Sequence, residues 1–357
     1  MNEDVYLVWG NHASTVGIGE IVFTVAASLP DRFVLKPSRA IRPGKLNIII
    51  DEFSNPYFVE QLAEVKKSDP ATRYVVVATE FITPVSVLGI EFTRTFNFFW
   101  AARDLRNLAR NWLHGPNRLP SYMHRRYLGF MKALPLFDLL VYVHPSIGSG
   151  LADVARKYPN LKSPPVVIYP ELPIPLVEPD DRLGFDVTGT ITRYRMKILH
   201  KLGKQFARAG WSQPAWRHVS FSATKPIELT DSTIDYHYDR KDKRVDVRAD
   251  VKENEKPFLF NINPPQQTGW PFSSPMRILR AAMLGQIPVV TKKFGDHEIE
   301  DIAWQWDGRL DTALKVIHLA MDREQLVDRY MQSVQRYNAV AREKNRPFVE
   351  ALDRLSA

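Results

Sequence analysis

The residues best suited to hold an anion lie around the start of a helix that we predict at 274–284. Ser274 is a good helix N-cap and Pro275 a good first helical residue. A first helical turn offers backbone N–H groups and the positive end of the helix dipole. Arg277 could add a bidentate contact to a phosphate there, whereas the alternative is a well-capped helix with a solvated arginine. The candidate anion-binding residues are Ser273, Ser274, Met276 and Arg277.

A second phosphate candidate follows a short strand that we predict at 184–187. Gly189 would let the backbone approach a ligand closely, and Thr190 could cap the next helix or donate to the ligand. Cations in a first helical turn oppose the helix dipole, which favours a bound anion over a merely solvated basic turn. The cations here are Arg193, Arg195 and Lys197. Asn263 ends another strand-like run and could hydrogen-bond a base or sugar. The plain alternative is that it only precedes the two prolines that end the strand.

The elements that must position these residues are short apolar strands alternating with helices. Strand-like runs at 5–9, 46–51, 74–79 and 138–143 alternate with helical patterns, and the second half repeats the arrangement. Continuous apolar strands separated by helices are typical of parallel sheets. We therefore predict an α/β protein of two Rossmann-like doubly wound domains facing a central cleft, with C-terminal helices. The expected N-terminal domain is 1–168, followed by a Pro-rich linker at 169–182 and a C-terminal domain at 183–335. Helices at 336–357 could pack back on the N-terminal domain. The helical patterns of the second half include 193–208, 310–321, 324–343 and 348–355.

The segment from Ser274 to Ile299 resembles the donor-binding segment of GT-B fold glycosyltransferases, in which a helix ending A-x-x-x-G-x-P-V-V precedes a glycine-containing loop and a glutamate. The residues that carry the resemblance are Ala281, Gly285, Pro288, Val289, Val290 and Gly295, with one extra residue between Gly285 and Pro288. Phe272 and Arg280 stand where the large retaining family has two glutamates. The resemblance therefore implies a divergent or inverting enzyme that uses a nucleotide-diphosphate sugar as co-substrate.

The same resemblance implies a general base in the N-terminal domain, because inverting GT-B enzymes often use a histidine in the loop after the first strand. His12 lies in that loop, and a histidine with an ordinary pKa near 6.5 can accept a proton at neutral pH. Glu80 competes, since it closes a strand and a buried carboxylate can also serve as base. The alternatives are a structural histidine and a glutamate that caps the next turn. We expect neither a cofactor nor a metal, because the sequence offers no well-placed Asp-x-Asp.

The net charge of +8 is concentrated in one segment of the first half. Between Arg94 and Lys132 lie seven arginines and one lysine against the single acid Asp104. Arg103, Arg106 and Arg110 share one face of a predicted helix, and the patch extends to Arg125 and Arg126. Such a basic surface with aromatic residues suits an anionic membrane or a lipid-linked acceptor. A solvated basic face is the plain alternative, and nucleic acid is disfavoured because no reader motif is present.

Composition excludes several classes of function. The chain of 357 residues has no cysteine, which rules out disulfides, zinc–thiolate sites and cysteine nucleophiles. We expect no secretory signal and no membrane span, since the apolar stretch at 81–100 is interrupted by Pro84, Glu91 and Arg94. The predicted localisation is cytoplasmic, peripheral at the inner face of the membrane.

Together these features predict a metal-independent, inverting glycosyltransferase. It would move a sugar from a nucleotide-diphosphate sugar to a hydroxyl of a surface-polysaccharide or glycolipid intermediate. Two alternatives stay open: a nucleotide-sugar epimerase of the same architecture, and a non-catalytic protein that binds a nucleotide or nucleic acid.

Overall fold

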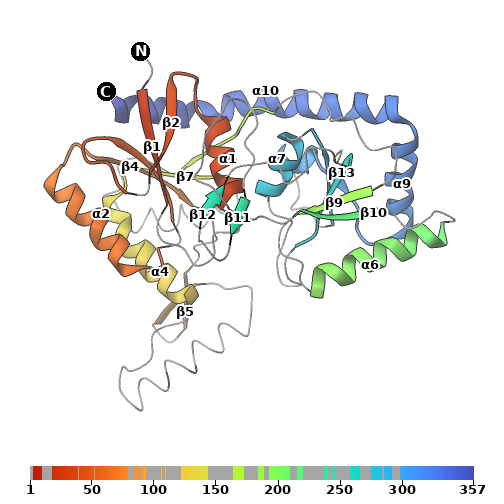
Figure 1. Ribbon diagram of the computed structural model, residues 1–357, viewed down its shortest axis with the longest axis horizontal. Coiled ribbons are helices and arrows are strands. Elements are labelled where there is room, and N and C mark those ends of the chain that lie inside the picture. Colours follow the sequence, from red (N-terminus) through yellow and green to blue (C-terminus); the bar gives the residue numbers. More distant parts are fainter. Residues whose placement is uncertain are drawn as a thin grey trace. The chain divides into compact units, whose positions relative to one another are not determined.

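The computed structural model groups the chain into two compact units (Figure 1). Unit 1 comprises residues 1–13, 29–168 and 345–357, and unit 2 comprises 14–28 and 169–344. The residues that the structure describes are 3–9, 18–38, 40–51, 53–78, 84–87, 90–93, 106, 109, 122–143, 164–172, 184–188, 193–209, 215–219, 237–239, 244–246, 258–265, 275–283, 285–291 and 298–357.

Unit 1 is built on a six-stranded parallel sheet in the order β2-β1-β3-β4-β7-β8. Its strands are β1 (Glu3–Trp9), β2 (Phe33–Ser38), β3 (Leu46–Ile50), β4 (Arg73–Ala78), β7 (Leu139–Tyr142) and β8 (Val166–Val167). Every residue of β3 is buried, as expected of a central strand in a parallel sheet. The chain moves from β1 to β2 on one side and later to β3 on the other, so the strand order reverses between β1 and β3.

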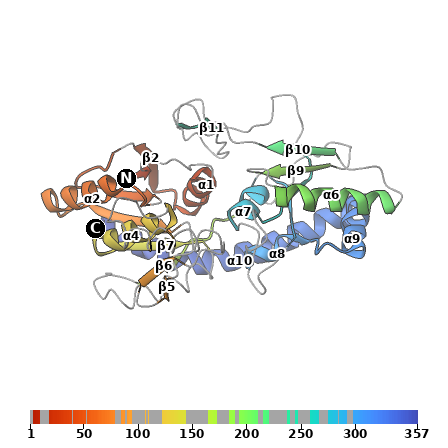
Figure 2. The same cartoon turned by 90° about the horizontal axis from the view of Figure 1, so that it is seen from below.

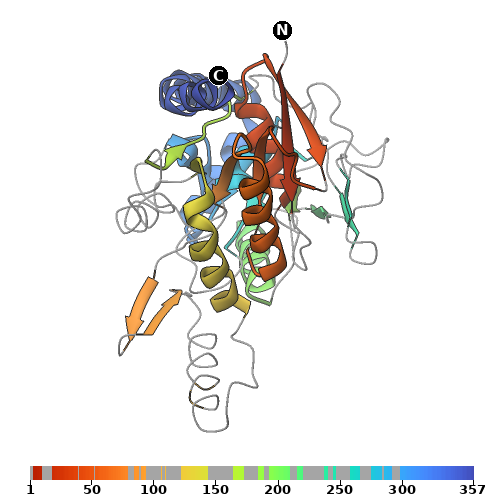
Figure 3. The same cartoon turned by 90° about the vertical axis from the view of Figure 1, so that its left-hand side faces the viewer.

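Two helices of unit 1, α2 (Pro56–Ser68) and α4 (Tyr122–Ala133), lie side by side (Figure 3). The amide oxygen of Asn55 accepts from the Tyr57 N–H at 3.1 Å and so caps α2. A short 3-10 turn, η2 (Leu134–Leu136), follows α4. Four aromatic rings pack beneath these helices at centroid distances of 5.5–6.3 Å, and they belong to Phe53, Phe58, Phe130 and Phe137.

Unit 2 is built on a five-stranded parallel sheet in the order β10-β9-β13-β14-β15. Its strands are β9 (Gly184–Thr188), β10 (Ala215–Val219), β13 (Phe260–Asn263), β14 (Ile287–Val290) and β15 (Trp304–Gln305). Here too the order reverses between the first and third strands along the chain, β9 and β13. Both units are thus Rossmann-like α/β structures, and the prediction of parallel sheets is confirmed.

The other helices among the described residues lie wholly or mostly in unit 2, and Figure 2 shows them from below. They are α1 (Ile18–Ser28), α6 (Arg193–Arg208), α7 (Pro275–Met283), the short α8 (Glu298–Asp301), α9 (Leu310–Met321) and the greater part of α10 (Arg323–Ser356). Helix α1 connects two strands of unit 1 in sequence but groups with unit 2, where it packs on α7. Two antiparallel strand pairs lie outside the main sheets: β5 (Pro84–Val87) with β6 (Ile90–Thr93), and β11 (His237–Asp239) with β12 (Arg244–Asp246).

Helix α10 differs from the sequence expectation of two separate helices at 324–343 and 348–355. It runs without interruption for 34 residues and includes Pro347. Proline normally breaks a helix, because it lacks the N–H and its ring clashes with the preceding turn. The apolar stripe of α10 continues past the proline through the buried Phe348 and Leu352, whereas Pro347 itself is exposed. Burial of this stripe outweighs the local cost of the proline.

Candidate functional site

The carboxyl edge of the unit 2 sheet is the place to look for the predicted donor-binding residues. In open parallel sheets, ligands bind outside the carboxyl ends of the strands at the point where the strand order reverses. In unit 2 that point lies between β9 and β13, which pair in parallel from Phe185 opposite Phe260 to Val187 opposite Ile262. The chain leaving β9 leads to α6, and the chain leaving β13 leads to α7.

Arg195, in the first turn of α6, links these two connections. Its side chain is 1% exposed, and its Nε donates to the carbonyl oxygen of Pro264 at 3.1 Å. Pro264 directly follows Asn263, the last residue of β13, which is also 1% exposed. A guanidinium stays charged at any relevant pH. Arg195 therefore fixes a positive charge beside the reversal point and holds the end of β13 against the start of α6.

A buried hydrogen-bond network holds the same strands together. The side-chain nitrogen of Gln286 donates to Asp186 Oδ2 at 2.6 Å and to the Phe258 carbonyl at 2.8 Å. Asn261 in turn donates to Gln286 Oε1 at 3.1 Å. A carboxylate inside the apolar run of β9 is the only sequence signal of this network. Buried polar groups joined in this way restrict strand register. Phe258 precedes β13 and Gln286 precedes β14, so the network ties the amino ends of these strands to β9.

The network and Asn263 lie on the face of the sheet opposite α6. The ring of Phe185 meets that of Phe206, in α6, at 5.9 Å and 90°, so Phe185 points toward α6. Side chains alternate along a strand, so Asp186 points to the other face, as does Asn261 opposite it in the register. Asn263, two residues beyond Asn261, shares that face. An amide thus stands on the last residue of β13, at the carboxyl edge of the sheet.

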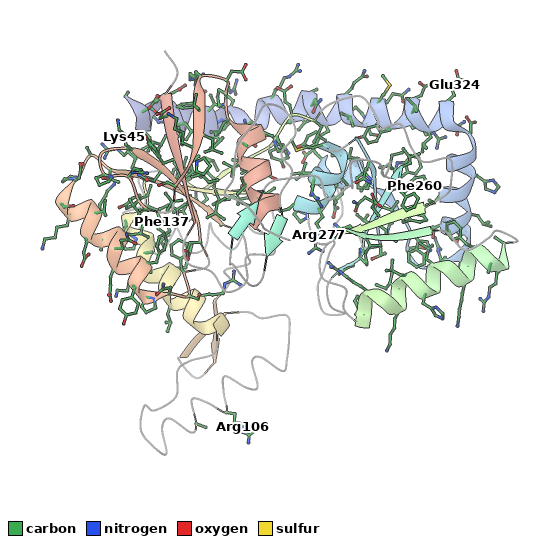
Figure 4. The ribbon with its side chains drawn as sticks, in the orientation of Figure 1. Lys45, Arg106, Phe137, Phe260, Arg277 and Glu324 are labelled. Atoms are coloured by element: carbon green, nitrogen blue, oxygen red, sulfur yellow. The ribbon has the colours of Figure 1, made fainter. Side chains whose placement is uncertain are left out.

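Helix α7 is held firmly from several sides. Seven of its nine residues are buried, and Arg277 is the part-exposed residue of its first turn (Figure 4). The hydroxyl of Thr24, in α1, lies 3.8 Å from the sulfur of Met276, and the Tyr330 hydroxyl donates to the Ala282 carbonyl at 3.1 Å. The first turns of both α6 and α7 contain no acidic residue. Two positively polarised helix starts therefore follow neighbouring strands of one sheet.

Glu298, the glutamate of the family resemblance, has structural partners in unit 2. It forms an ion pair with Lys344, and the Tyr169 hydroxyl lies 3.4 Å from its Oε2. The Lys344 ammonium also lies 5.6 Å from the centre of the Tyr169 ring. Burial, followed by the nearby Tyr169 and Glu298, raises the pKa of Tyr337 well above its ordinary value. Glu298 thus belongs to a cluster that ties α8 to α10 and to the start of the segment predicted as linker.

The other predicted donor residues fall into two groups. Lys197 is exposed on α6, and Met276 is buried. Arg193 lies in the first turn of α6, but its side chain is not among those that the structure describes. Gly189, Thr190, Ser273 and Ser274 lie outside the described residues, as do both candidate bases, His12 and Glu80. The structure therefore brings Arg195 and Asn263 to one edge, and the assignment of the base stays a prediction.

The predicted basic patch is described only in part. Arg106 is helical and exposed, and Arg126, on α4, is partly buried. Arg103 and Arg110 lie outside the described residues, and Arg125 is described only as a helical position of α4. A membrane or acceptor role for this patch stays a prediction.

Within the described part of the chain, no cluster of three or more His, Asp or Glu side chains could hold a metal ion. Among the same residues, no helix combines the length and apolar character needed to cross a bilayer.

Comparisons with known proteins find a distant structural likeness. No family model matches the chain, and no curated protein matches it. A solved structure described as the glycotransferase of kitacinnamycin aligns over 100% of both chains with 11% sequence identity and a TM-score of 0.39. A likeness at this level carries no argument about activity, so the function must be argued from the site itself.

Proposed function

We propose that this protein is a glycosyltransferase that takes its sugar from a nucleotide-diphosphate sugar bound at the carboxyl edge of unit 2. The observation that carries the proposal is the buried Arg195, whose Nε binds the Pro264 carbonyl at the reversal point between β9 and β13. A fixed cation, two helix starts without acids and the amide of Asn263 form a suitable setting for a diphosphate and its nucleoside.

The proposed chemistry is direct displacement at the anomeric carbon. A base, His12 or Glu80, takes the proton of an acceptor hydroxyl as its oxygen attacks the anomeric carbon. The bond from that carbon to the diphosphate oxygen breaks, and the nucleoside diphosphate leaves with the bonding electrons. Positive charge from Arg277, Lys197 and the helix starts stabilises the leaving group, and no metal is required. One displacement inverts the configuration of the sugar.

The first test is nucleotide affinity. Arg277→Ala should weaken binding of UDP, GDP, TDP or ADP, whichever the wild-type chain binds most tightly, by about 1–3 kcal/mol, which corresponds to a roughly 5- to 150-fold rise in Kd. Titration calorimetry measures this change. Arg208→Ala is the matched control, because Arg208 is exposed at the other end of α6. Equal affinity of the Arg277 variant and the control would remove α7 from the donor site.

The second test separates the transferase from the alternatives. The wild-type chain is incubated with the corresponding nucleotide sugar, and products are followed by chromatography. A transferase releases nucleoside diphosphate, at least slowly by transfer to water. An epimerase changes the sugar and keeps the diphosphate bond, and a binding protein leaves the nucleotide sugar intact. Either of the last two results overturns the proposal.

A further inference from the structure

The exposed face of helix α6, in unit 2, carries a row of cations. Lys197, Lys201, Lys204 and Arg208 are all exposed, and they follow one another at intervals of three or four residues. At about 100° per residue, the four positions lie within about 60° of one another around the helix axis. They form one row, with one cation per turn, that is about 16 Å long at a rise of about 1.5 Å per residue. We call these four residues the cationic row.

The charge pattern of α6 differs from that of α10, the other long exposed helix of unit 2. On α10, opposite charges stand one turn apart, and Arg346 Nε lies 3.9 Å from Glu350 Oε1. Helix α6 contains six Lys and Arg residues and no acid. Like charges three or four residues apart destabilise a helix, and the helix dipole offsets this only near the C-terminal end. A bound anion would relieve the repulsion along the whole cationic row.

The cationic row is not neutralised by the described part of the chain. Among the described residues, none of its four side chains forms an ion pair with a carboxylate. The Lys201 ammonium extends toward the neighbouring loop, where a Cβ on Gly308 would lie 3.0 Å from it. The acid of that loop, Asp307, is paired with Arg309 at 2.8 Å and accepts from the Thr312 hydroxyl. The charge of the row is therefore available to an external ligand.

The inner face of α6 supports the cationic row firmly. The side-chain nitrogen of Gln205 donates to the Gly308 carbonyl at 2.7 Å, and its oxygen accepts from the Trp306 indole at 2.9 Å. The ring of Phe206 packs against that of Phe185, in β9, at 5.9 Å. All three anchoring side chains of the helix and sheet are buried, so the row is held in a fixed line.

We propose that the cationic row binds an acidic polysaccharide that carries one carboxylate on every sugar ring. A ring in such a polymer is about as long as one helical turn, about 5.4 Å, so one carboxylate per ring matches one cation per turn. Among the exposed side chains described on α6, none is a large apolar group that could enter a bilayer. None is a Phe, Tyr or Trp ring either, and sites for single-stranded nucleic acid stack bases on such rings. A linear chain bound by its charges fits this face best.

The position of α6 gives this polymer a role. The helix starts at the carboxyl edge of the unit 2 sheet, where the proposed donor site lies, so a polymer along the row has one end beside that site. We assign the polymer as the acceptor. This role alone rests on the proposed function, whereas the binding does not. Lys197 also belongs to the proposed donor site, so the test leaves it unchanged.

The experiment measures binding of a defined oligosaccharide to the full chain. The probe is a fluorescently labelled hexamer of β-1,4-linked mannuronate, and fluorescence anisotropy gives its Kd. The combined variant Lys201→Gln, Lys204→Gln, Arg208→Gln should raise that Kd by about tenfold, because each exposed charge pair contributes modestly. The wild-type affinity should fall as salt is added. Glutamine is a good helix former and removes the repulsion, so the melting temperature of the variant should not fall.

The matched control removes the same charge from α10. Arg329, Arg336 and Arg354 are exposed there, and their combined replacement by glutamine lowers the net charge equally. This control should bind the hexamer as the wild type does. If it loses as much affinity as the α6 variant, the binding reflects overall charge and the inference is wrong.

Three further probes test the chemistry of the ligand. A hyaluronan oligosaccharide with the same number of carboxylates, one on every second ring, should bind more weakly because fewer of them fall along the row. Equal affinity overturns the match of one charge per turn. Tighter binding of a single-stranded oligonucleotide of the same charge also overturns the inference. So does binding to phosphatidylglycerol vesicles that depends on Lys201, Lys204 and Arg208 while the hexamer fails to bind.

Nucleotide affinity is measured on the same samples, and it should be equal in the wild-type chain and the α6 variant. Nucleotide binding without hexamer binding defeats the inference alone. Hexamer binding that depends on the cationic row, without nucleotide binding, defeats the proposed function alone.

Discussion

At the scale of single residues, α4 approaches the backbone of Phe53 so closely that Gly129 has no room for a side chain. A Cβ placed on Gly129 would lie 1.8 Å from the carbonyl oxygen of Phe53 and 2.9 Å from its carbonyl carbon. No rotamer change relieves a clash with backbone. Gly129 is therefore required by the neighbouring chain rather than by its own conformation.

We expect Gly129→Ala to destabilise the protein. Alanine gains about 1 kcal/mol of helix propensity over glycine, but overpacking against backbone costs about 1–3 kcal/mol or more. The clash is with backbone at 1.8 Å, so the cost should reach the upper end of that range. The net effect should be a loss of about 2 kcal/mol or more, measured by urea unfolding. Gly203→Ala is the matched control, because Gly203 is also helical and its added Cβ would meet nothing within 4 Å. That variant should be equal to or more stable than wild type.

At the proposed donor site, the residue types could be read from the sequence, but their environments could not. The cations at the start of α6 were predicted to bind phosphate, and the structure buries Arg195 and leaves Lys197 exposed. Nothing local distinguishes the two, because burial depends on the loop after β13, far away in sequence.

At the scale of elements, the carboxylate of Asp307, two residues before the N-cap Arg309, stabilises the first turn of helix α9. Asp307 accepts from the Thr312 hydroxyl at 2.7 Å and from the Arg309 N–H at 3.0 Å. The bond from Thr312 is the main cause that lowers the pKa of Asp307 below its ordinary value of 3.8. A carboxyl group with a lowered pKa stabilises the fold above its ordinary pKa, and that contribution is lost as the pH falls through the lowered value.

Asp307→Ala should therefore lower the free energy of unfolding at pH 7 by less than about 1 kcal/mol, since the group is near the surface. The difference from wild type should stay constant down to about pH 5 and shrink as the pH falls below 3.8. Urea unfolding at a series of pH values measures it. Asp328→Ala, which removes an exposed acid from α10, is the control. A difference that grows on acidification would contradict this role of Asp307.

Elements with a strong local pattern were predicted well. The helices expected at 193–208 and 310–321 occur with those bounds, and the central strands lie within a residue or two of their predicted ends. Strand β2 was not predicted, because it carries Lys36 and Pro37, which are typical of edge strands rather than of buried ones. Helix α10 was predicted as two because local sequence shows the proline but not the apolar surface that the helix covers.

At the scale of the whole molecule, the chain passes between its two units more often than a central linker would require. Helix α1 belongs to unit 2, although it connects β1 and β2 of unit 1, and the last 13 residues of α10 belong to unit 1. The predicted linker at 169–182 begins with residues tied to α10, since Asn338 exchanges two hydrogen bonds of 2.8 Å with the backbone of Leu172. A return of the C-terminal helices to the N-terminal domain was expected from the sequence. The grouping of α1 with unit 2 was not, because sequence order assigns each segment to the unit of its neighbours.

This grouping predicts which segments unfold together. Regions of a protein that open cooperatively share their amide exchange behaviour. Gly184→Ala should weaken unit 2 selectively, because its Cβ would lie 2.4 Å from the Phe258 ring. Amides of α1 should then exchange faster together with β9 and β13, while β1 and β2 keep their protection. Hydrogen exchange of the full chain, followed by mass spectrometry, measures this.

The reciprocal variant completes the argument. Gly129→Ala weakens unit 1, so it should speed exchange in β3, in β4 and at 345–357, while the part of α10 before Lys344 stays protected by its contacts in unit 2. The amides of one continuous helix would thus exchange at two different rates, with the change near Pro347. Proline has no N–H, so the helical hydrogen bonds that couple the two parts are interrupted there. If the amides of α1 instead change their exchange rates together with those of β1 and β2 in both variants, α1 unfolds with unit 1, and its grouping with unit 2 is wrong.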